Sequence, residues 1–401
     1  MDYKLGNFRG ILKTQVLIIG GGPSGLLLSQ LLMKAGIETI ILEKQSRQYI
    51  LNRIRAGVIE PNSVEVLKNA GIGDRIDAEG IKHQGTILSH SNHTIRIDFK
   101  KATKKAVTVY GQTEITKDLF KAQDNLNAKI FHGIKNIQVE NLCEKSPRII
   151  FDTETGEKKY IEADFIAGCD GFHGISRSWI PEKNLSVYEN RYPFGWLGIL
   201  SETPPVNDEL IYSSSSSGFA LASMRSSKLS RYYIQCDLDT KPEDYTDDFF
   251  WLELKKRLPK KYSEKLITGP SIEKSIAPLR SFVVEPIQYG KLYLAGDAAH
   301  IVPPTGAKGL NLAISDIYYL SQAFITFYND NEKNLLESYS QIALKRIWKT
   351  VRFSWWMTTL LHTFPNSSHF EKKIQSSEFF NLSESQYAMG ALAENYVGLP
   401  Y

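Results

Sequence analysis

The sequence predicts a mixed α/β (α+β) fold in which a parallel strand–helix–strand unit comes first, an antiparallel sheet follows and helices close the chain. Three observations lead to this prediction. A β-branched run, a glycine-rich turn and a leucine-rich helical pattern occupy residues 13–43. Short strand patterns follow one another over residues 194–238, and a helical pattern covers most of residues 310–362. Such a segregation of strands and helices is typical of a mixed fold.

The composition is that of a globular protein. The chain has 401 residues, which predicts two to three domains at roughly 150 residues each. Hydrophobic residues make up 42% and charged residues 23%, which excludes a disordered, collagen-like or coiled-coil chain. The net charge of +4 comes with no dense basic stripe, which argues against a nucleic-acid binder. This charge suits small anionic ligands at least as well.

Cysteine usage and hydropathy point to a cytoplasmic protein. Cys143, Cys169 and Cys236 are far apart and odd in number, which argues against a disulfide framework and a structural zinc site. No cluster of histidine, cysteine and carboxylate residues suggests a metal. The longest apolar run near the start, Val16–Ile19, is too short for a signal peptide, and no run approaches the roughly 20 residues that span a bilayer.

The first elements form one strand–helix–strand unit. Gln15–Ile19 is rich in β-branched residues, as expected for a buried parallel strand. Residues 26–33 carry apolar side chains at helical spacing, and Gly36 ends that helix. Thr39–Leu42 forms the second strand. The residues before this unit, Met1–Leu12, lack periodicity and are expected to form a tail.

Hairpins, a helix and a further strand are expected next. A hairpin is indicated where two alternating runs flank a short polar turn. The expected elements are the hairpins Thr86–Leu88 with Thr94–Ile97 and Ile149–Phe151 with Lys159–Ile161, the helix Asp118–Asn127 and the strand Asp164–Gly168.

The middle of the chain has the pattern of an antiparallel sheet. The serine tract Ser213–Ser217 lies between two strand patterns and is interpreted as a flexible turn. A helix over Asp247–Leu258 and a strand over Lys291–Ala295 follow. The expected strands of the sheet are Trp196–Leu200, Leu210–Tyr212, Phe219–Ser223 and Tyr232–Leu238.

Gly20, Gly22 and Gly25 form a GxGxxG motif between the first strand and the first helix. The first glycine permits a tight turn, the second lets a pyrophosphate approach the backbone, and the third lets helix and strand pack closely. The helix start offers free N–H groups to phosphates. Glu43, which ends the second strand, can accept hydrogen bonds from a ribose and would repel a 2′-phosphate. The motif therefore predicts a Rossmann-like site for FAD or NAD rather than NADP, although a glycine-rich turn alone can be purely structural.

Two later motifs carry a family resemblance. Cys169–Gly174 and Gly296–His300 each follow a predicted strand, and the second leads into Pro303–Asn311. Together with the first motif, in this order, they resemble the three motifs of the single-component flavoprotein aromatic hydroxylases. Further segments resemble the members of this family that act on 4-hydroxybenzoate and extend the resemblance over nearly the whole chain from about Lys13. They are Asn52–Gly57, Val109–Glu114, Tyr192–Trp196, Lys274–Pro286 and Ala393–Tyr401.

The resemblance implies a domain order. A tail over residues 1–12 precedes a Rossmann-like FAD-binding domain over 13–186, which carries a substrate-side hairpin insertion near 83–112. An antiparallel-sheet substrate-binding domain covers 187–301. A helical C-terminal region over 302–401 adds flavin contacts. Its aromatic residues suggest a homodimer interface, with an intramolecular core as the alternative.

The resemblance also implies the residues that hold FAD and NADPH. The start of the helix after Gly306 places N–H groups and a helix dipole where they stabilise negative charge on the flavin. The family's usual arginine after the ribose carboxylate is Lys44 here, which keeps the charge but loses the bidentate fork. Arg47 can compensate by binding the 2′-phosphate, and NADH stays open as an alternative to NADPH. The implied FAD residues are Gly20, Gly22, Ser24, Gly25, Glu43, Arg53, Arg55, Gln112, Asp170, Asp297, Gly306, Leu310 and Asn311, and the implied NADPH residues are Lys44, Arg53, His173 and Arg280.

A substrate carboxylate site is expected on neighbouring strands. Ser223 and Arg225 are two residues apart, as are Arg231 and Tyr233, so each pair shares one face of a strand. If a turn joins the strands, the four side chains converge; a solvated surface hairpin is the alternative. Arginine offers a planar fork to a carboxylate, and hydroxyls add donors. The resemblance assigns Ser223, Arg225 and Tyr233 to the carboxylate, and Arg231 to electrostatic support near substrate and flavin.

The phenol end of the substrate has its own implied residues. The resemblance assigns Tyr212 and Tyr396 to a proton relay, in which each hydroxyl donates and accepts. His83 matches the solvent-side member of that relay, where an ordinary pKa near 6.5 suits proton exchange. Pro304 matches a residue whose backbone carbonyl receives the phenolic O–H. Packing roles are the alternative for each of these side chains.

The implied reaction is hydroxylation of 4-hydroxybenzoate at C3 to 3,4-dihydroxybenzoate (protocatechuate), with NADPH and O2, through a flavin C4a-hydroperoxide and a phenolate substrate. The cofactor performs the oxygen chemistry, while the protein supplies binding and proton control. One alternative is a hydroxylase of another phenolic or aminobenzoic acid, which product identity would reveal. The other is a non-catalytic FAD protein that binds an aromatic acid, which substrate binding without NADPH turnover would reveal.

Overall fold

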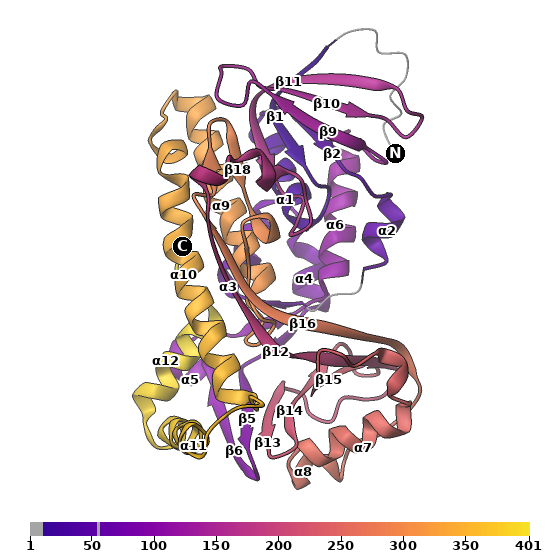
Figure 1. The fold of residues 1–401 in the computed structure, drawn as a ribbon, viewed down its shortest axis with the longest axis vertical. Helices are drawn as coiled ribbons and strands as arrows, with labels where there is room; N and C mark the ends of the chain where they lie inside the picture. The colour runs from indigo at the N-terminus through magenta and orange to yellow at the C-terminus, as the bar shows by residue number, and fades with distance from the viewer. Residues whose placement is uncertain (1–10, 54–56) are drawn as a thin grey trace.

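The computed structural model describes residues 11–53 and 57–401, and Figure 1 shows their arrangement. The upper half holds a mostly parallel sheet with its helices, and the lower half holds a mostly antiparallel sheet, in which one pair of neighbouring strands is parallel. Two long strands, β12 (Ser186–Ser201) and β16 (Ser271–Glu285), run from one half into the other, with the helix α10 (Asn334–Leu361) beside them. Segments far apart in sequence therefore meet at the junction of the two halves.

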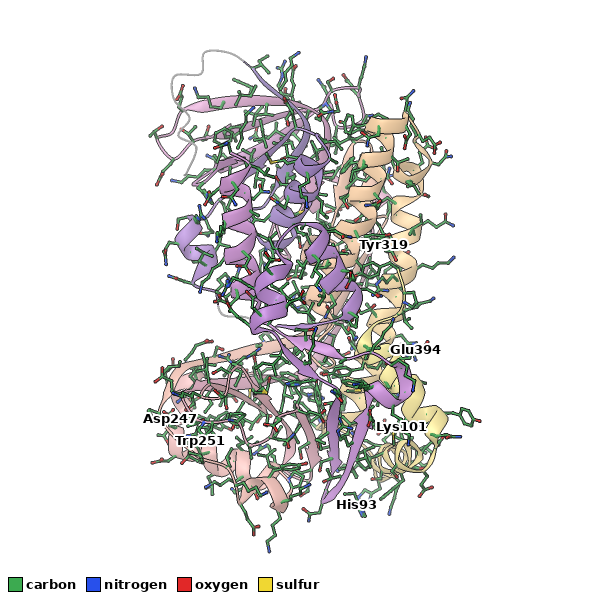
Figure 2. The ribbon with its side chains drawn as sticks, turned by 180° about the vertical axis from the view of Figure 1, so that it is seen from behind. His93, Lys101, Asp247, Trp251, Tyr319 and Glu394 are labelled. Atoms are coloured by element: carbon green, nitrogen blue, oxygen red, sulfur yellow. The ribbon has the colours of Figure 1, made fainter. Side chains whose placement is uncertain are left out.

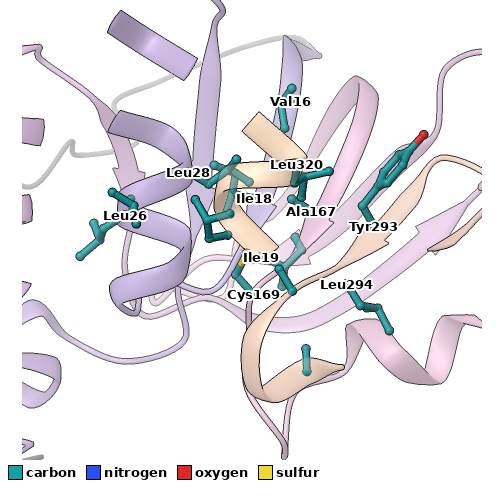
Figure 3. Packing of buried hydrophobic residues seen from close by; sticks show 14 of the residues in the cluster. Val16, Ile18, Ile19, Leu26, Leu28, Ala167, Cys169, Tyr293, Leu294 and Leu320 are labelled. Atoms are coloured by element: carbon teal, nitrogen blue, oxygen red, sulfur yellow. The ribbon is translucent and has the colours of Figure 1, made fainter. Parts of the chain in front are cut away.

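The upper sheet is built around β1 (Leu12–Ile19), which pairs in parallel with β2 (Thr39–Leu42) and with β11 (Lys158–Gly168). Its strand order is β17-β18-β11-β1-β2-β8. The side chains of Val16–Ile19 are buried, as predicted for a strand covered on both faces. Figure 3 shows Val16, Ile18 and Ile19 among other buried apolar side chains, which include Leu26, Leu28 and Leu320. The other strands are β8 (Lys129–Phe131), β9 (Lys135–Glu140), β10 (Arg148–Asp152), β17 (Gln288–Tyr289) and β18 (Leu292–Leu294).

Two predictions for this sheet need correction. Leu12, expected in the tail, is the first residue of β1 and lies opposite Ile161; the tail before residue 11 lies outside the described residues. The strands expected at Lys159–Ile161 and Asp164–Gly168 are parts of the single strand β11. Its first part pairs with β10 and its last part with β18, so partners on both sides keep the backbone extended throughout.

The helices of the upper half cover this sheet. The predicted first helix is α1 (Pro23–Lys34), which packs against α6 (Gln112–Asn125) and α9 (Gly309–Asp330). Helix α6 begins before the predicted Asp118, because Ile115 is buried and extends the apolar face by one turn. The shorter helices are α2 (Arg47–Leu51), α3 (Pro61–Asn69) and α4 (Gly73–Glu79), and a small sheet joins β3 (Val58–Ile59), β7 (Val107–Val109) and β4 (Ile81–His83).

The lower sheet has the strand order β19-β16-β12-β15-β14-β13-β5-β6. It confirms the predicted antiparallel strands of the middle of the chain and adds the predicted hairpin of β5 (Gly85–His90) and β6 (His93–Asp98) at its edge. The strand expected to reach Leu238 ends earlier, at Cys236, and Leu238 is exposed. The remaining strands are β13 (Ile211–Ser215), β14 (Gly218–Met224), β15 (Ser230–Cys236) and β19 (His300–Ile301).

The serine tract is not the flexible turn that the sequence predicted. Ser213 to Ser215 belong to β13, and only Ser216 and Ser217 lie in the turn to β14. The Ser213 hydroxyl donates to the Arg257 carbonyl at 2.5 Å, and the Ser215 hydroxyl donates to the Gly218 carbonyl at 3.0 Å. Serine is small enough to be buried between strand and helix, provided that its hydroxyl finds an acceptor.

The remaining helices enclose the lower sheet from two sides. Helix α7 (Asp247–Arg257), as predicted, and α8 (Lys260–Ser263) lie on one side; α5 (Phe99–Thr103), α11 (His369–Glu384) and α12 (Gln386–Val397) lie on the other. Figure 2 shows Asp247 and Trp251 of α7 across the molecule from Lys101 of α5 and Glu394 of α12. The predicted C-terminal helical region divides into α9 and α10 at Asn331, which is left-handed. In the described ranges, no helix is long and apolar enough to cross a membrane.

Candidate active site

The GxGxxG turn has the geometry that the sequence predicted. A Cβ on Gly20, whose φ is +105°, would lie 2.4 Å from the carbonyl oxygen of Cys169, and a Cβ on Gly25 would lie 2.0 Å from that of Gly20. By contrast, no described atom lies within 4 Å of a Cβ placed on Gly22. Packing therefore requires the outer two glycines, while Gly22 leaves open space at the start of α1. The N–H groups of Gly22, Ser24 and Gly25 have no intrahelical acceptor there.

Glu43 lies under this turn. Its carboxylate accepts hydrogen bonds from the N–H groups of Gly21 at 2.6 Å and Gln45 at 2.7 Å. Each oxygen keeps a further lone pair, which can accept from a ribose hydroxyl. Lys44 is exposed directly after it. Arg47, expected to compensate for Lys44, instead forms a bidentate ion pair with Asp124 at 3.0 and 2.7 Å, since that carboxylate matches its planar fork.

The two Asp-containing motifs differ in how their carboxylates are used. Both oxygens of Asp170 accept from Ser176, at 2.9 Å from its N–H and 2.5 Å from its hydroxyl, so Asp170 holds its own loop together. Asp297 is exposed, and within the described residues no hydrogen bond engages its carboxylate. Of the two, Asp297 is therefore the one free to contact a ligand.

A buried ion pair supports the Asp297 turn from below. The ring nitrogen Nε2 of His300 lies 2.5 Å from Oδ2 of Asp316, which also accepts from the N–H of Gly296 at 2.9 Å. Burial alone would lower the pKa of His300, but the Asp316 carboxylate outweighs it and the pKa is raised. This pair joins the Gly-Asp turn to α9. Sequence reasoning missed Asp316, because its partner is set only by the packing of α9.

The start of α9 faces the same region. Gly306 has φ +86° and lies against Phe353, and α9 begins at Gly309, so its first N–H groups, including that of Leu310, have no intrahelical acceptor. Asn311 was expected to contact a flavin. Its side-chain amide instead donates to the carbonyls of Val58 and Ala307, both at 2.9 Å, and accepts from the N–H of Glu60 at 2.8 Å. That side chain joins α9 to β3 and leaves the backbone N–H as the group available for a ligand.

The other expected cofactor residues come from several further elements. Gln112 starts α6 directly after Gly111, and Arg53 is exposed, with its carbonyl accepting from the Thr113 hydroxyl at 3.1 Å. Arg55 lies outside the described residues. His173 and Arg280 both contact Phe172: the His173 ring packs on its edge, and the Arg280 guanidinium lies 4.6 Å from its ring centre. The structure thus brings together two of the four residues expected for NADPH.

The two strands expected to bind a substrate carboxylate are neighbours, as predicted. Ser223 of β14 lies opposite Arg231 of β15, and Tyr233 lies on the same face. Both Ser223 and Arg231 are buried, which rejects the surface-hairpin alternative. Arg225 follows β14, and its Nε and Nη1 are buried with no hydrogen-bond partner among the described residues. Burial lowers the pKa of Arg225, opposed by Tyr233 and assisted by the like charge of Arg231. A buried guanidinium with free donors is a site for an anion.

The two expected relay tyrosines meet although they are distant in sequence. The hydroxyls of Tyr212 on β13 and Tyr396 on α12 lie 2.8 Å apart and are buried. Burial raises the pKa of Tyr212 to about 12, although bonds to Tyr396 and to the backbone of Gly306 lower it. Burial also raises the pKa of Tyr396, whose hydroxyl in addition contacts Thr86. Both hydroxyls therefore stay neutral at physiological pH.

The other two residues expected at the phenol end are Pro304 and His83. The Pro304 carbonyl accepts from the N–H of Ala307 at 2.9 Å and retains a second lone pair. His83, which matches the solvent-side member of the expected relay, is itself buried, with 1% of its surface exposed. Its strand β4 is an edge strand of the small three-stranded sheet, and both ring nitrogens lack a partner among the described residues. Burial lowers the pKa of His83.

Comparisons with known proteins agree with this geometry. Residues 13–354 match the protein family described as FAD binding domain. The chain is 52% identical over 391 residues to the p-hydroxybenzoate hydroxylase of Acinetobacter baylyi, covering 97% of this chain and 96% of that protein. It is 25% identical to 6-hydroxy-3-succinoylpyridine 3-monooxygenase of Pseudomonas putida, covering 80% and 81%. The solved structure of p-nitrophenol 4-monooxygenase from Pseudomonas putida shares the fold, with a TM-score of 0.81 at 18% identity over 98% of this chain and all of that one.

Proposed function

From the premise that this chain belongs to the FAD binding domain family, we propose that it is an NADPH-dependent monooxygenase that hydroxylates 4-hydroxybenzoate at C3. The products are 3,4-dihydroxybenzoate, NADP⁺ and water; NADPH, a proton and O2 are consumed. Bound FAD supplies the redox chemistry, accepting a hydride from NADPH and activating O2. The extensive similarity to a p-hydroxybenzoate hydroxylase supports the substrate.

The observation that carries the proposal is the spacing, on one sheet face, of the two tyrosines that mark the polar ends. Tyr212 lies opposite Leu221, and Leu221 lies opposite Tyr233, so the two tyrosines share a row and are two strands apart. Strands are spaced about 4.8 Å, which separates the backbones of the two tyrosines by roughly 10 Å. This span suits a benzene ring with a polar group at each end, each hydrogen-bonded to the protein.

At one end, we assign Arg225 to the substrate carboxylate, with Ser223 and Tyr233 as additional donors. The buried nitrogens of Arg225 would then be paired rather than left without partners. A charge-assisted, bidentate contact fixes the orientation of the ring as well as its affinity. Arg231 lies beside this group and adds positive potential for substrate and flavin.

At the other end, the protein controls the phenolic proton. Before ionisation, the Pro304 carbonyl can accept the phenolic O–H. The Tyr212 hydroxyl then takes that proton while it donates its own to Tyr396, so neither tyrosine has to ionise. His83, which burial keeps neutral, is the basic group proposed to receive the proton further along. Loss of the proton makes the ring carbon next to the oxygen electron-rich.

The described residues fit FAD. The open space at Gly22 and the free N–H groups of Ser24 and Gly25 suit its pyrophosphate, and Glu43 suits the adenosine ribose. The free carboxylate of Asp297 suits the ribityl chain. The N–H groups of Leu310 and Asn311 would stabilise negative charge on the flavin ring. The other proposed contacts are Gln112, Arg53 and the loop that Asp170 holds.

We propose that NADPH binds near His173 and Arg280, which share Phe172 as a support. Lys44 and Arg53 supply further positive charge, as the family resemblance implies. NADH remains an alternative, because the Arg47 fork is engaged by Asp124. Initial rates with the two cofactors at equal concentrations decide between them; we expect NADPH to be used faster.

The test is aerobic incubation of the purified yellow protein with NADPH and 4-hydroxybenzoate, followed by product identification. One equivalent of 3,4-dihydroxybenzoate per NADPH supports the proposal. Fast NADPH oxidation that yields only hydrogen peroxide rejects the substrate and indicates a different phenolic or aminobenzoic acid. Binding of 4-hydroxybenzoate without any NADPH oxidation indicates a non-catalytic FAD protein.

We further propose a cytoplasmic homodimer. The three cysteines are free, as suits a reducing compartment. Trp355, Phe370 and Tyr387 on α10, α11 and α12 are 49%, 74% and 81% exposed, which suits a contact surface. Light scattering on the purified protein is expected to give a molar mass twice that of one chain. A molar mass equal to that of one chain would contradict the dimer.

A further inference from the structure

We propose that Glu273 sets the charge of the substrate pocket and thereby selects ligands that carry a single carboxylate. The inference rests on the proposed function, in which Arg225 holds the substrate carboxylate. It concerns a residue of β16 that the sequence analysis did not identify. It assigns to Glu273 a positioning and specificity role and no direct contact with the reacting atoms.

The geometry behind this inference is a closed network around Arg231. The guanidinium Nη1 of Arg231 lies 2.9 Å from Oε2 of Glu273. Ser275 bridges the same two side chains: its hydroxyl accepts from Nη2 of Arg231 at 2.9 Å and donates to Oε1 of Glu273 at 3.1 Å. The Ser275 hydroxyl therefore gives its one proton to Glu273 and accepts a proton from Arg231, which fixes the positions of these two side chains relative to each other.

Burial makes this network electrostatically important. The Arg231 side chain is 6% exposed and the Glu273 side chain 30% exposed. A Cβ on Gly198 would lie 2.5 Å from the Tyr233 ring and 3.3 Å from Nη2 of Arg231, so glycine at that position leaves room for the Tyr233 ring beside the guanidinium. The contact of Nη1 with Oε2 is close but is not aligned as a hydrogen bond. It is therefore mainly a Coulombic contact, and its strength depends on the charge of Glu273.

The two cations Arg225 and Arg231 and the anion Glu273 together determine which ligands the pocket accepts. Arg231 acts on Arg225 as a like charge and Glu273 as an opposite one. With Glu273 engaged by Arg231, the group left to bind an anion is Arg225, whose Nε and Nη1 have no partner among the described residues. The neighbouring Lys274 is directed elsewhere, to Asp247 at 3.0 Å. One carboxylate neutralises the three groups together, whereas a second would be buried without a counter-charge.

The prediction is that Glu273→Gln widens the specificity towards dicarboxylates. The neutral amide keeps the shape of the side chain and the hydrogen bond from Ser275, but it no longer balances the positive charge of Arg231. The probes are 4-hydroxybenzoate and 4-hydroxyphthalate, which keeps the para hydroxyl and adds a carboxylate beside the first. Dissociation constants are measured on the full-length FAD-loaded protein by the change in flavin absorbance on binding.

In the unaltered protein we expect 4-hydroxybenzoate to bind at least 100-fold more tightly than 4-hydroxyphthalate. In Glu273→Gln we expect this ratio to fall at least tenfold. The matched control is Glu264→Gln, which makes the same charge change at a surface ion pair with Lys260 and should leave the ratio unchanged. Ser275→Ala keeps the charge of Glu273 and should lower the ratio less than Glu273→Gln does.

A ratio that stays within threefold of the original in Glu273→Gln overturns the inference, and so does an equal weakening of both ligands, which would indicate a packing role. If Glu273→Gln does not fold, Arg231→Gln provides the opposite test. This variant leaves the negative charge of Glu273 unbalanced beside Arg225. It should therefore weaken the binding of 4-hydroxybenzoate at least tenfold more than the binding of the neutral 4-hydroxybenzamide. Equal effects on the two ligands would contradict the proposal. Failure of the unaltered protein to bind 4-hydroxybenzoate at all would instead reject the proposed function.

Discussion

The two ends of the proposed substrate site hold their polar groups in opposite ways. At the carboxylate end, Arg225 keeps two buried guanidinium nitrogens for which the described residues offer no partner. At the phenol end, Tyr212 and Tyr396 hydrogen-bond each other at 2.8 Å. A cation cannot pair with a neighbouring cation and needs an anion from outside, whereas a hydroxyl is both donor and acceptor. One end is therefore built to bind a ligand, and the other to pass a proton.

The largest effect is expected from removing the cation. Arg225→Gln should raise the dissociation constant of 4-hydroxybenzoate by roughly 100- to 1000-fold, because one partner of a buried charge pair is lost. Flavin absorbance titration measures this value. The neutral 4-hydroxybenzamide serves as the control ligand and should change far less. A loss below tenfold for the acid would show that another group binds the carboxylate.

Breaking the tyrosine pair should leave binding almost intact and slow hydroxylation. Tyr396→Phe removes the acceptor for the Tyr212 proton, and we expect the hydroxylation rate to fall about 100-fold. Rapid-mixing measurements of product formation, beside a binding titration, separate the two quantities. Tyr339→Phe is the matched control, since Tyr339 is also buried and donates to the Leu294 carbonyl away from the site. Equal losses in both variants would point to packing rather than proton transfer.

The same pair predicts a loss of stability at alkaline pH. Tyr212 has a pKa of about 12 in the folded protein, against about 10 when unfolded. Only the unfolded chain loses this proton between these values, so the contribution of Tyr212 is fully present below pH 10 and is lost as pH rises towards 12. The expected size is about 2 to 3 kcal/mol. The free energy of unfolding, measured with urea from pH 8 to 11, should therefore fall less steeply in Tyr212→Phe than in the unaltered protein. Parallel pH dependences of the two proteins would contradict the raised pKa.

The smallest effect concerns a neutral donor at the carboxylate end. Ser223→Ala should weaken 4-hydroxybenzoate by about three- to tenfold, the range expected for one hydrogen bond of about 1 kcal/mol. Within the described part of the chain, the Ser223 hydroxyl has only a long 3.3 Å contact to the Met224 carbonyl, so its loss leaves little else unsatisfied. An effect as large as that of Arg225→Gln would mean that charge is not what distinguishes the two ends.

Sequence reasoning was strongest where local pattern and backbone geometry coincide. The glycine turn at Gly20, the strands around it and the hairpin that carries Ser223 and Arg231 follow from spacing within short windows. It was weakest where a side chain has competing partners. Arg47 found Asp124, and the side-chain amide of Asn311 found three backbone groups, which leaves only the backbone N–H of Asn311 for the contact expected of it.

The parallel unit, the antiparallel middle and the helical end follow from local pattern, because hydrophobic periodicity and turn residues act over a few neighbouring positions. The amino-acid sequence also sets the types of side chain available at the site. Which of these side chains meet depends on the packing of the whole fold. Tyr212 and Tyr396, or Arg231 and Glu273, are brought together by sheet pairing and helix packing. Such contacts depend on the whole fold, because the free energy of a buried polar group is decided by the partner beside it.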